Sequence, residues 1–139
     1  MCGGVSFIEY GEDRKIFFPM QNAVLPVLLK SGEIGLYTWG RRREECNQTF
    51  PFGGWARHES IKQGIWEKYH PVPVKIPVQK FMEKDDLGVS HWFDLQAGEF
   101  IQGLLANIGD KQRVYVVTVH PEDEHAVHER WPRILSKSF

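Results

Sequence analysis

The sequence predicts a strand-rich α+β fold, a single domain over residues 1–139 in which twisted antiparallel sheets are accompanied by a few short helices. Two observations predict this class. Strand signals recur along the whole chain, whereas helical signals are confined to two short stretches. No repeat, low-complexity segment or linker divides the 139 residues, and this length suits one hydrophobic core.

Six segments have the composition of strands, with alternating apolar and polar residues or a short apolar run between turn residues. In chain order they are residues 6–10, 23–29, 33–39, 72–78, 91–95 and 113–120. Pro26 interrupts the second segment, and Pro73 and Pro77 interrupt the fourth. Proline cannot donate to a strand ladder, so we expect these two segments to avoid central ladder positions.

Two stretches predict helices. Residues 60–69 place Ile61 and Ile65 on one face. The second helix is expected to begin at Pro121, because proline suits the first turn and the acidic residues that follow favour the positive end of the helix dipole. Pro132 would stop this helix.

Composition gives no general attraction to nucleic acid or membrane, because the formal net charge is −1 at pH 7. No apolar run approaches the roughly 20 residues of a membrane span, and the N-terminus lacks a signal-peptide pattern. Two cysteines, Cys2 and Cys46, do not make a disulfide framework. We therefore expect a cytoplasmic protein without a membrane partner.

A group of histidines near the C-terminus, His120, His125 and His128, invites a metal interpretation. Two of them lie three positions apart and would share a helix face. However, no cysteine or carboxylate pattern completes a known zinc spacing. We expect neither a metal nor another cofactor.

The cysteine directly after the initiator, Cys2, is the most informative residue. Removal of Met1, which is usual when the second residue is small, would leave an α-amine and a thiol on adjacent carbons. These groups titrate near pH ~8 and ~8.5, so a fraction of each is nucleophilic at neutral pH. Such a 1,2-aminothiol condenses with an aldehyde to an imine and can then close a thiazolidine ring. The alternative is an ordinary second residue without a role.

Four segments resemble, in order, the signatures of one family. The first is Met1-Cys2-Gly3, and the second is Gly54-Trp55-Ala56-Arg57-His58-Glu59-Ser60, which resembles an Asn-Ala-Arg-Ala-Glu-Thr signature. The third, Pro77-Val78-Gln79-Lys80-Phe81-Met82-Glu83, resembles Pro-Ala-Asp-Gly-Phe-Tyr-Glu. The fourth, His128-Glu129-Arg130-Trp131-Pro132-Arg133-Ile134-Leu135, resembles His-Asp-Arg-Met-Pro-Val-Ile-Leu. Over nearly its whole length the chain resembles the SOS-response-associated peptidase (SRAP) family of abasic-site-processing proteins. It resembles a short and divergent member, of the kind that phages carry.

The resemblance implies an activity in the DNA damage response. Family members process their own N-terminus and attack the ring-opened aldehyde of an abasic site in single-stranded DNA, forming a stable thiazolidine crosslink. Cys2 matches the nucleophile of the family, and Glu83 matches the carboxylate of N-terminal processing and proton transfer. His128 matches the histidine that assists ring opening. The implied partner is single-stranded DNA that contains abasic sites.

Five arginines are candidates for contact with DNA phosphate. Arg57 matches a phosphate-binding residue of the family, and Arg130 lies in the histidine motif. Arg41, Arg42 and Arg43 form the only run of three basic residues, which would add phosphate attraction. The alternative for this run is a solvated loop, since two glutamates follow at once.

Two departures from the family pattern leave two functions open. Trp55 stands where the family has asparagine, and its indole donates one hydrogen bond but accepts none. Gly4 replaces an arginine. The chain is either a lesion-processing enzyme that reacts through Cys2 or a non-catalytic protein of the same fold, single-strand-binding or structural, in which Trp55 fills the asparagine pocket. On a DNA-binding face Trp55 would be available to stack exposed bases.

Overall fold

The structure is a computed structural model of the chain, and it describes residues 2–45, 49–121 and 130–136. Strands dominate, as the sequence predicts, and most of them pair antiparallel. The described helices are a five-residue α-helix, α1 (His58–Lys62), and a three-residue 3₁₀ helix, η1 (Glu67–Tyr69). The described part is therefore mostly β, with less helix than the α+β class implies.

The first sheet has four antiparallel strands in the order β2-β1-β7-β8. Their bounds are Cys2–Glu9 for β1, Glu12–Phe17 for β2, Lys80–Lys84 for β7 and Ser90–Asp94 for β8. A two-residue turn, Tyr10-Gly11, joins β1 to β2, and both of its residues have positive φ. That pattern is typical of a type I′ hairpin turn, whose twist matches the twist of the strands.

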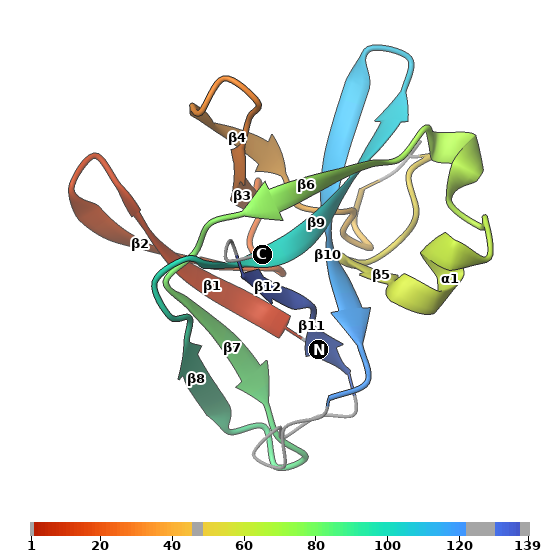
Figure 1. The fold of residues 1–139 in the computed structure, drawn as a ribbon. Coiled ribbons are helices and arrows are strands. Elements are labelled where there is room, and N and C mark those ends of the chain that lie inside the picture. Colours follow the sequence, from red (N-terminus) through yellow and green to blue (C-terminus); the bar gives the residue numbers. More distant parts are fainter. Residues whose placement is uncertain (1, 46–48, 122–129, 137–139) are drawn as a thin grey trace.

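The second sheet follows the order β11-β10-β9-β6-β3-β4, with β12 beside β9 and β5 parallel to β10. Its strands are β3 (Val24–Leu28), β4 (Ile34–Thr38), β5 (Trp55–Arg57), β6 (Val72–Ile76), β9 (Glu99–Ile108), β10 (Lys111–Val119), β11 (Trp131–Pro132) and β12 (Ile134–Ser136). The long hairpin of β9 and β10 forms its centre, and α1 lies beside β5 at one side of it (Figure 1).

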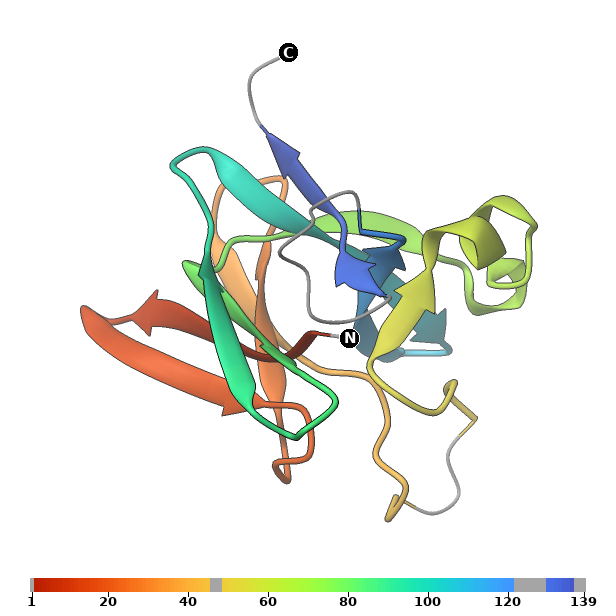
Figure 2. The same ribbon diagram turned by 90° about the horizontal axis from the view of Figure 1, so that it is seen from below.

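The larger hydrophobic cluster joins the two sheets. Phe81 of β7 stacks on Phe93 of β8, and the ring of Trp131 of β11 packs edge-on against both, with centroids 4.9 Å apart. A smaller cluster, including Trp66 and Tyr115, packs between the second sheet and the α1–η1 segment. Seen from below, the start of β1 lies where β5 and β11 approach the first sheet (Figure 2). The start of β1 is thus held between the sheets.

The proline-containing segments are strands, and their position explains how they tolerate proline. Pro26 lies in β3 and Pro73 in β6, yet the two strands pair with each other only at Leu28 and Lys75. Each proline is therefore placed where its strand has a partner on one side only, which needs no N–H on the other side.

The helix expected over residues 60–69 is broken in two. Gly64 has a φ of 83°, so the chain turns there between α1 and η1. The helix expected from Pro121 falls almost wholly on residues 122–129, outside the described residues. In the described part, no helix has the length and apolarity needed to cross a bilayer.

Candidate functional site

A β-bulge at the start of β1 directs Cys2 toward Glu83. Cys2 and Glu83 are register partners between β1 and β7, whereas the next pair is Gly4 with Met82, so Gly3 is an extra residue in β1. A regular ladder would place Cys2 opposite Lys84, with its side chain on the other face of the sheet. The bulge therefore brings together two of the three side chains for which the sequence predicts a catalytic role.

Both side chains are closed to solvent, each with a relative exposure of 0%. Burial raises the pKa of the Cys2 thiol to about 12, and the negative charge of Glu83 adds to this rise. The thiol donates a hydrogen bond of 3.5 Å to the carbonyl of Gly4. Burial also raises the pKa of the Glu83 carboxyl, while the positive charge of the amino terminus opposes that rise. In this arrangement the sulfur is a neutral thiol at pH 7.

Trp55 fixes the backbone of Cys2. Its Nε1 donates a 2.6 Å hydrogen bond to the carbonyl oxygen of Cys2. The indole also packs against Phe18, with ring centroids 4.8 Å apart. Since Trp55 begins β5 of the second sheet, this bond ties the start of β1 to the opposite sheet. Indole can only donate a hydrogen bond, and the backbone carbonyl of Cys2, the candidate nucleophile, is its acceptor.

A pocket of about 490 Å³ adjoins the Cys2–Glu83 pair, and we call it the Trp55 pocket. Aromatic rings line one part of it and charged side chains of the β7–β8 turn line another. Cys2 and Glu83 do not line it themselves, but their chain neighbours Gly3 and Met82 do. The other lining residues are Phe17, Phe18, Pro19, Trp55, Lys84, Asp85, Asp86 and Ser90.

Gly4, the second departure from the family pattern, has a packing reason. A Cβ atom at this position would lie 2.8 Å from Cδ1 of Phe17 and 3.3 Å from the carbonyl of Ile16. Any side chain here would displace the Phe17 ring, which lines the Trp55 pocket. Local packing of the β1–β2 hairpin therefore favours glycine where the family has arginine.

Two polar residues that the sequence analysis did not single out, His91 and Asp85, lie beside the Cys2–Glu83 pair, and His91 extends the row of register partners. His91 of β8 is the register partner of Glu83, so the three residues follow one another across the sheet. Asp85 holds the imidazole, with Oδ2 of Asp85 2.9 Å from Nε2 of His91, and the hydrogen bond from His91 lowers the pKa of Asp85. No spacing in the sequence reveals this pair, because it depends on the register of β7 and β8. His128, the histidine expected at the site, lies outside the described residues.

Arg57 and Arg130 occupy different environments. Arg57 ends β5 and is exposed. Arg130 is 6% exposed, and its guanidinium donates 3.0 and 3.3 Å hydrogen bonds to the Glu59 carboxylate and a 2.7 Å bond to the Thr118 carbonyl. The hydrogen bonds from Arg130 lower the pKa of Glu59 to about 2. Arg130 therefore joins β10 to α1, and a contact with DNA remains a prediction for both arginines.

The three consecutive arginines do not lie at the Cys2–Glu83 pair. The guanidinium groups of Arg41 and Arg43 lie over the exposed ring of Phe52, 5.7 and 5.5 Å from its centroid. Arg42 points the other way and is buried, with its guanidinium 4.6 Å from the centroid of Phe18. Because Phe18 also lines the Trp55 pocket, this ring connects Arg42 to the site.

Within residues 2–45, 49–121 and 130–136, no group of three or more His, Cys, Asp or Glu side chains is placed to hold a metal ion. Comparisons of the chain with protein-family models, with curated proteins and with solved structures gave no match.

Proposed function

We propose that this chain captures the aldehyde of ring-opened abasic sites in single-stranded DNA through Cys2, after removal of Met1, as the resemblance to the SRAP family implies. The observation that carries the proposal is the pairing of Cys2 with Glu83, where a bulge aligns a thiol with a buried carboxylate. Burying a carboxylate among apolar side chains is costly, so its presence beside the candidate nucleophile favours a chemical role.

Glu83 has a defined task in this chemistry. It accepts a proton from the α-ammonium group of Cys2, and the free amine then attacks the aldehyde carbon. The carbinolamine takes up a proton as its hydroxyl group leaves as water, which gives the protonated imine. The thiol of Cys2 then adds to the imine carbon and releases its proton to solvent, and this closes the thiazolidine with one water released overall. The raised pKa of Glu83 makes its carboxylate a better base for the first step.

The Trp55 pocket has properties that suit an abasic nucleotide and its neighbours. A volume of about 490 Å³ is within the usual range for a bound small molecule. The rings of Phe17, Phe18 and Trp55 offer faces for stacking of unpaired bases. For the thiol to react, the first residues of β1 must open locally, since Cys2 is closed to solvent.

A single-strand-binding protein without the covalent step is the second candidate. The observation that favours it is the closed state of Cys2, which combines a pKa raised to about 12 with a backbone held by Trp55. Both candidates share the DNA surface and differ only in whether an adduct forms.

The test is incubation of the purified full chain with a single strand that carries one abasic site, followed by a denaturing gel. We expect a stable adduct that Cys2→Ser abolishes, although borohydride should still trap an imine of that variant through its α-amine. Cys46→Ser, at the other cysteine of the sequence, is the matched control and should leave the adduct unchanged. Glu83→Gln should slow adduct formation by roughly 10²-fold. Absence of any Cys2-dependent adduct from both the native chain and Trp55→Asn would leave the binding protein as the better description.

A further inference from the structure

The guanidinium of Arg42 is buried without enough hydrogen-bond acceptors. The residue is 6% exposed, and its Nη1 and Nη2 atoms have no acceptor among the described residues. Its flat face lies over Phe18, which holds the group in place. A buried charged donor without an acceptor is costly, so the position favours an additional anion beside Arg42.

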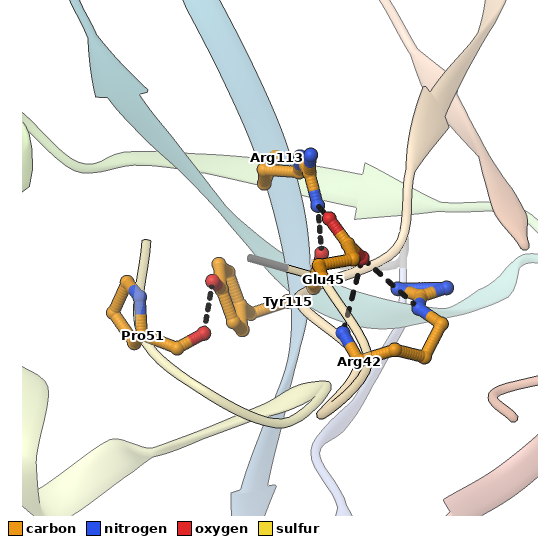
Figure 3. Close-up of polar contacts among 6 residues, drawn as sticks. Arg42, Glu45, Pro51, Arg113 and Tyr115 are labelled. Carbon is orange, nitrogen blue, oxygen red and sulfur yellow. Dashed lines mark hydrogen bonds and ion pairs between the residues drawn. The ribbon is translucent and has the colours of Figure 1, made fainter. Parts of the chain in front are cut away.

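One carboxylate, that of Glu45, serves two arginines (Figure 3). Its Oε1 accepts a 3.1 Å hydrogen bond from the backbone N–H of Arg42 and lies 3.4 Å from Nε of that residue. Its Oε2 accepts a 2.8 Å bond from Nη1 of Arg113. Both oxygens of Glu45 therefore already accept a hydrogen bond, and neither of them reaches the outer nitrogens of Arg42.

A polar cavity of about 560 Å³ opens at this cluster. Arg42, Glu45 and Arg113 line it together with side chains that can donate hydrogen bonds, those of Gln21, Asn22 and Thr38. Glu44 also lines the cavity, so its charged lining consists of two arginines and two glutamates. The outer nitrogens of Arg42 nevertheless lack acceptors among the described residues and lie beside a lining rich in hydrogen-bond donors, which suits an oxyanion.

We propose that this cavity binds a phosphate group, which takes the place of the Glu45 carboxylate between Arg42 and Arg113. A phosphate presents more acceptor oxygens than a carboxylate, so it can reach Nη1 and Nη2 of Arg42 as well as the guanidinium of Arg113. Glu45 then acts as an internal competitor that occupies the site until the phosphate enters.

The phosphate can belong to a nucleic-acid strand or to a small molecule. The cavity and the Trp55 pocket share Pro19 as a lining residue, and Phe18 separates Arg42 from that pocket. A strand with one nucleotide in the Trp55 pocket would therefore carry a neighbouring phosphodiester to Arg42. This source rests on the proposed function, whereas a free phosphate does not.

The first experiment titrates the full chain with inorganic phosphate at constant ionic strength, with sodium chloride as the balancing salt, and follows binding by calorimetry. We expect saturable binding that Arg42→Met weakens at least tenfold. Glu45→Gln should strengthen binding severalfold, because it removes the competing negative charge and leaves both arginines in place. Arg14→Met is the matched control, since Arg14 also pairs with a glutamate and lies over a phenylalanine ring, but on β2.

The two variants of the cavity keep the proposal open to refutation even if one of them folds poorly. Equal affinity of the native chain and Arg42→Met, or weaker binding by Glu45→Gln, would overturn it, because Arg42 would then have a structural role only. Failure of phosphate to bind more tightly than chloride would overturn it as well.

The second experiment distinguishes the sources of the phosphate. A single-stranded oligonucleotide and its uncharged methylphosphonate analogue are compared on the native chain and on Arg42→Met. If the phosphate comes from a strand, Arg42→Met weakens binding of the charged oligonucleotide but not binding of the methylphosphonate analogue. Inorganic phosphate then competes with the charged oligonucleotide. If Arg42→Met weakens inorganic phosphate alone, the site serves a free phosphate. Neither result depends on an adduct at Cys2, so failure of the proposed crosslinking chemistry would be seen separately.

Discussion

At the scale of the residue, Glu83 is the side chain whose position most needs explanation. It lies on the buried face of β7, two residues from Phe81, and packing alone would favour an apolar side chain there. Its raised pKa means that the folded state binds its proton more tightly than the unfolded state does. The carboxylate therefore destabilises the fold near neutral pH, which is a cost that a functional residue can impose.

Glu83→Gln should accordingly change how stability depends on pH. In the native chain the contribution of Glu83 is fully present below its ordinary pKa of 4.5 and is lost as the pH rises through the raised pKa of the folded state. Glutamine does not titrate, so the variant should lack this fall and be the more stable protein at neutral pH. Urea unfolding between about pH 4 and pH 8 measures the difference, and Glu12→Gln, at an exposed position of β2, is the control. Parallel curves for the native chain and Glu83→Gln would contradict the assignment.

Trp55→Phe isolates the hydrogen bond that Trp55 donates to the carbonyl of Cys2. Phenylalanine keeps most of the ring packing and removes the donor, so we expect a loss of about 1 kcal/mol in unfolding free energy. The start of β1 should also open more often, which should speed the reaction of Cys2. Trp92→Phe is the control, because its indole nitrogen makes no hydrogen bond within the described part of the chain. Unchanged exchange of the β1 amides in the Trp55 variant would show that the bond does not hold this strand.

At the scale of the element, the sequence predicts strands well where the side chains alternate or include a β-branched run. The segments at 23–29, 33–39, 91–95 and 113–120 are all strands in their central parts. Strand β9 was not predicted from the sequence, because it is buried along most of its length and its residues do not alternate between apolar and polar. Strand β2 was not predicted either, because it lies at a sheet edge and is largely charged.

In the candidate site, too, some features could be predicted from the sequence and others could not. The pair of Cys2 and Glu83 could be predicted by resemblance, because both residues lie in segments that match the family. The contact of Trp55 with Cys2 could not, since it joins strands that are distant in sequence. The pair of His91 and Asp85 could not either, since it depends on the register of the β7–β8 hairpin. The bulge at Gly3 could not be predicted either, because glycine near a chain end has no unique structural meaning.

Arg130 and Arg57 provide a test of how α1 is attached to the sheet. Arg130→Gln should lower the unfolding free energy by about 2 kcal/mol or more, because it breaks charged hydrogen bonds to Glu59 and a bond to the Thr118 carbonyl. Arg57→Gln, at an exposed position, should change stability by less than about 0.5 kcal/mol and weaken DNA binding instead. Thermal or urea unfolding of both variants checks the first part. Equal stability of the two variants would contradict a structural role for Arg130.

At the scale of the whole molecule, two sheets hold the start of β1 between them (Figure 2), and the Trp55 pocket adjoins it. The net charge of −1 gives no long-range attraction to DNA, so binding must come from local groups of arginine and lysine. This distribution predicts a modest affinity that depends on a small number of phosphate contacts.

Binding of single-stranded DNA should therefore weaken with salt in proportion to those contacts. For single strands the logarithm of affinity falls with the logarithm of salt concentration by roughly 0.7 per neutralised phosphate. Fluorescence anisotropy at several salt concentrations gives the slope, and an intact duplex is the control. Binding that is independent of salt, or that prefers the duplex, is incompatible with this surface.

The most direct measurement of the central claim is the intact mass of the protein before and after reaction with an abasic single strand. Before the reaction, the account predicts a chain without Met1. After it, the account predicts an added mass equal to that of the oligonucleotide less one water, and peptide fragmentation should place the addition at Cys2. A chain that retains Met1, or an adduct at another residue, would contradict the account.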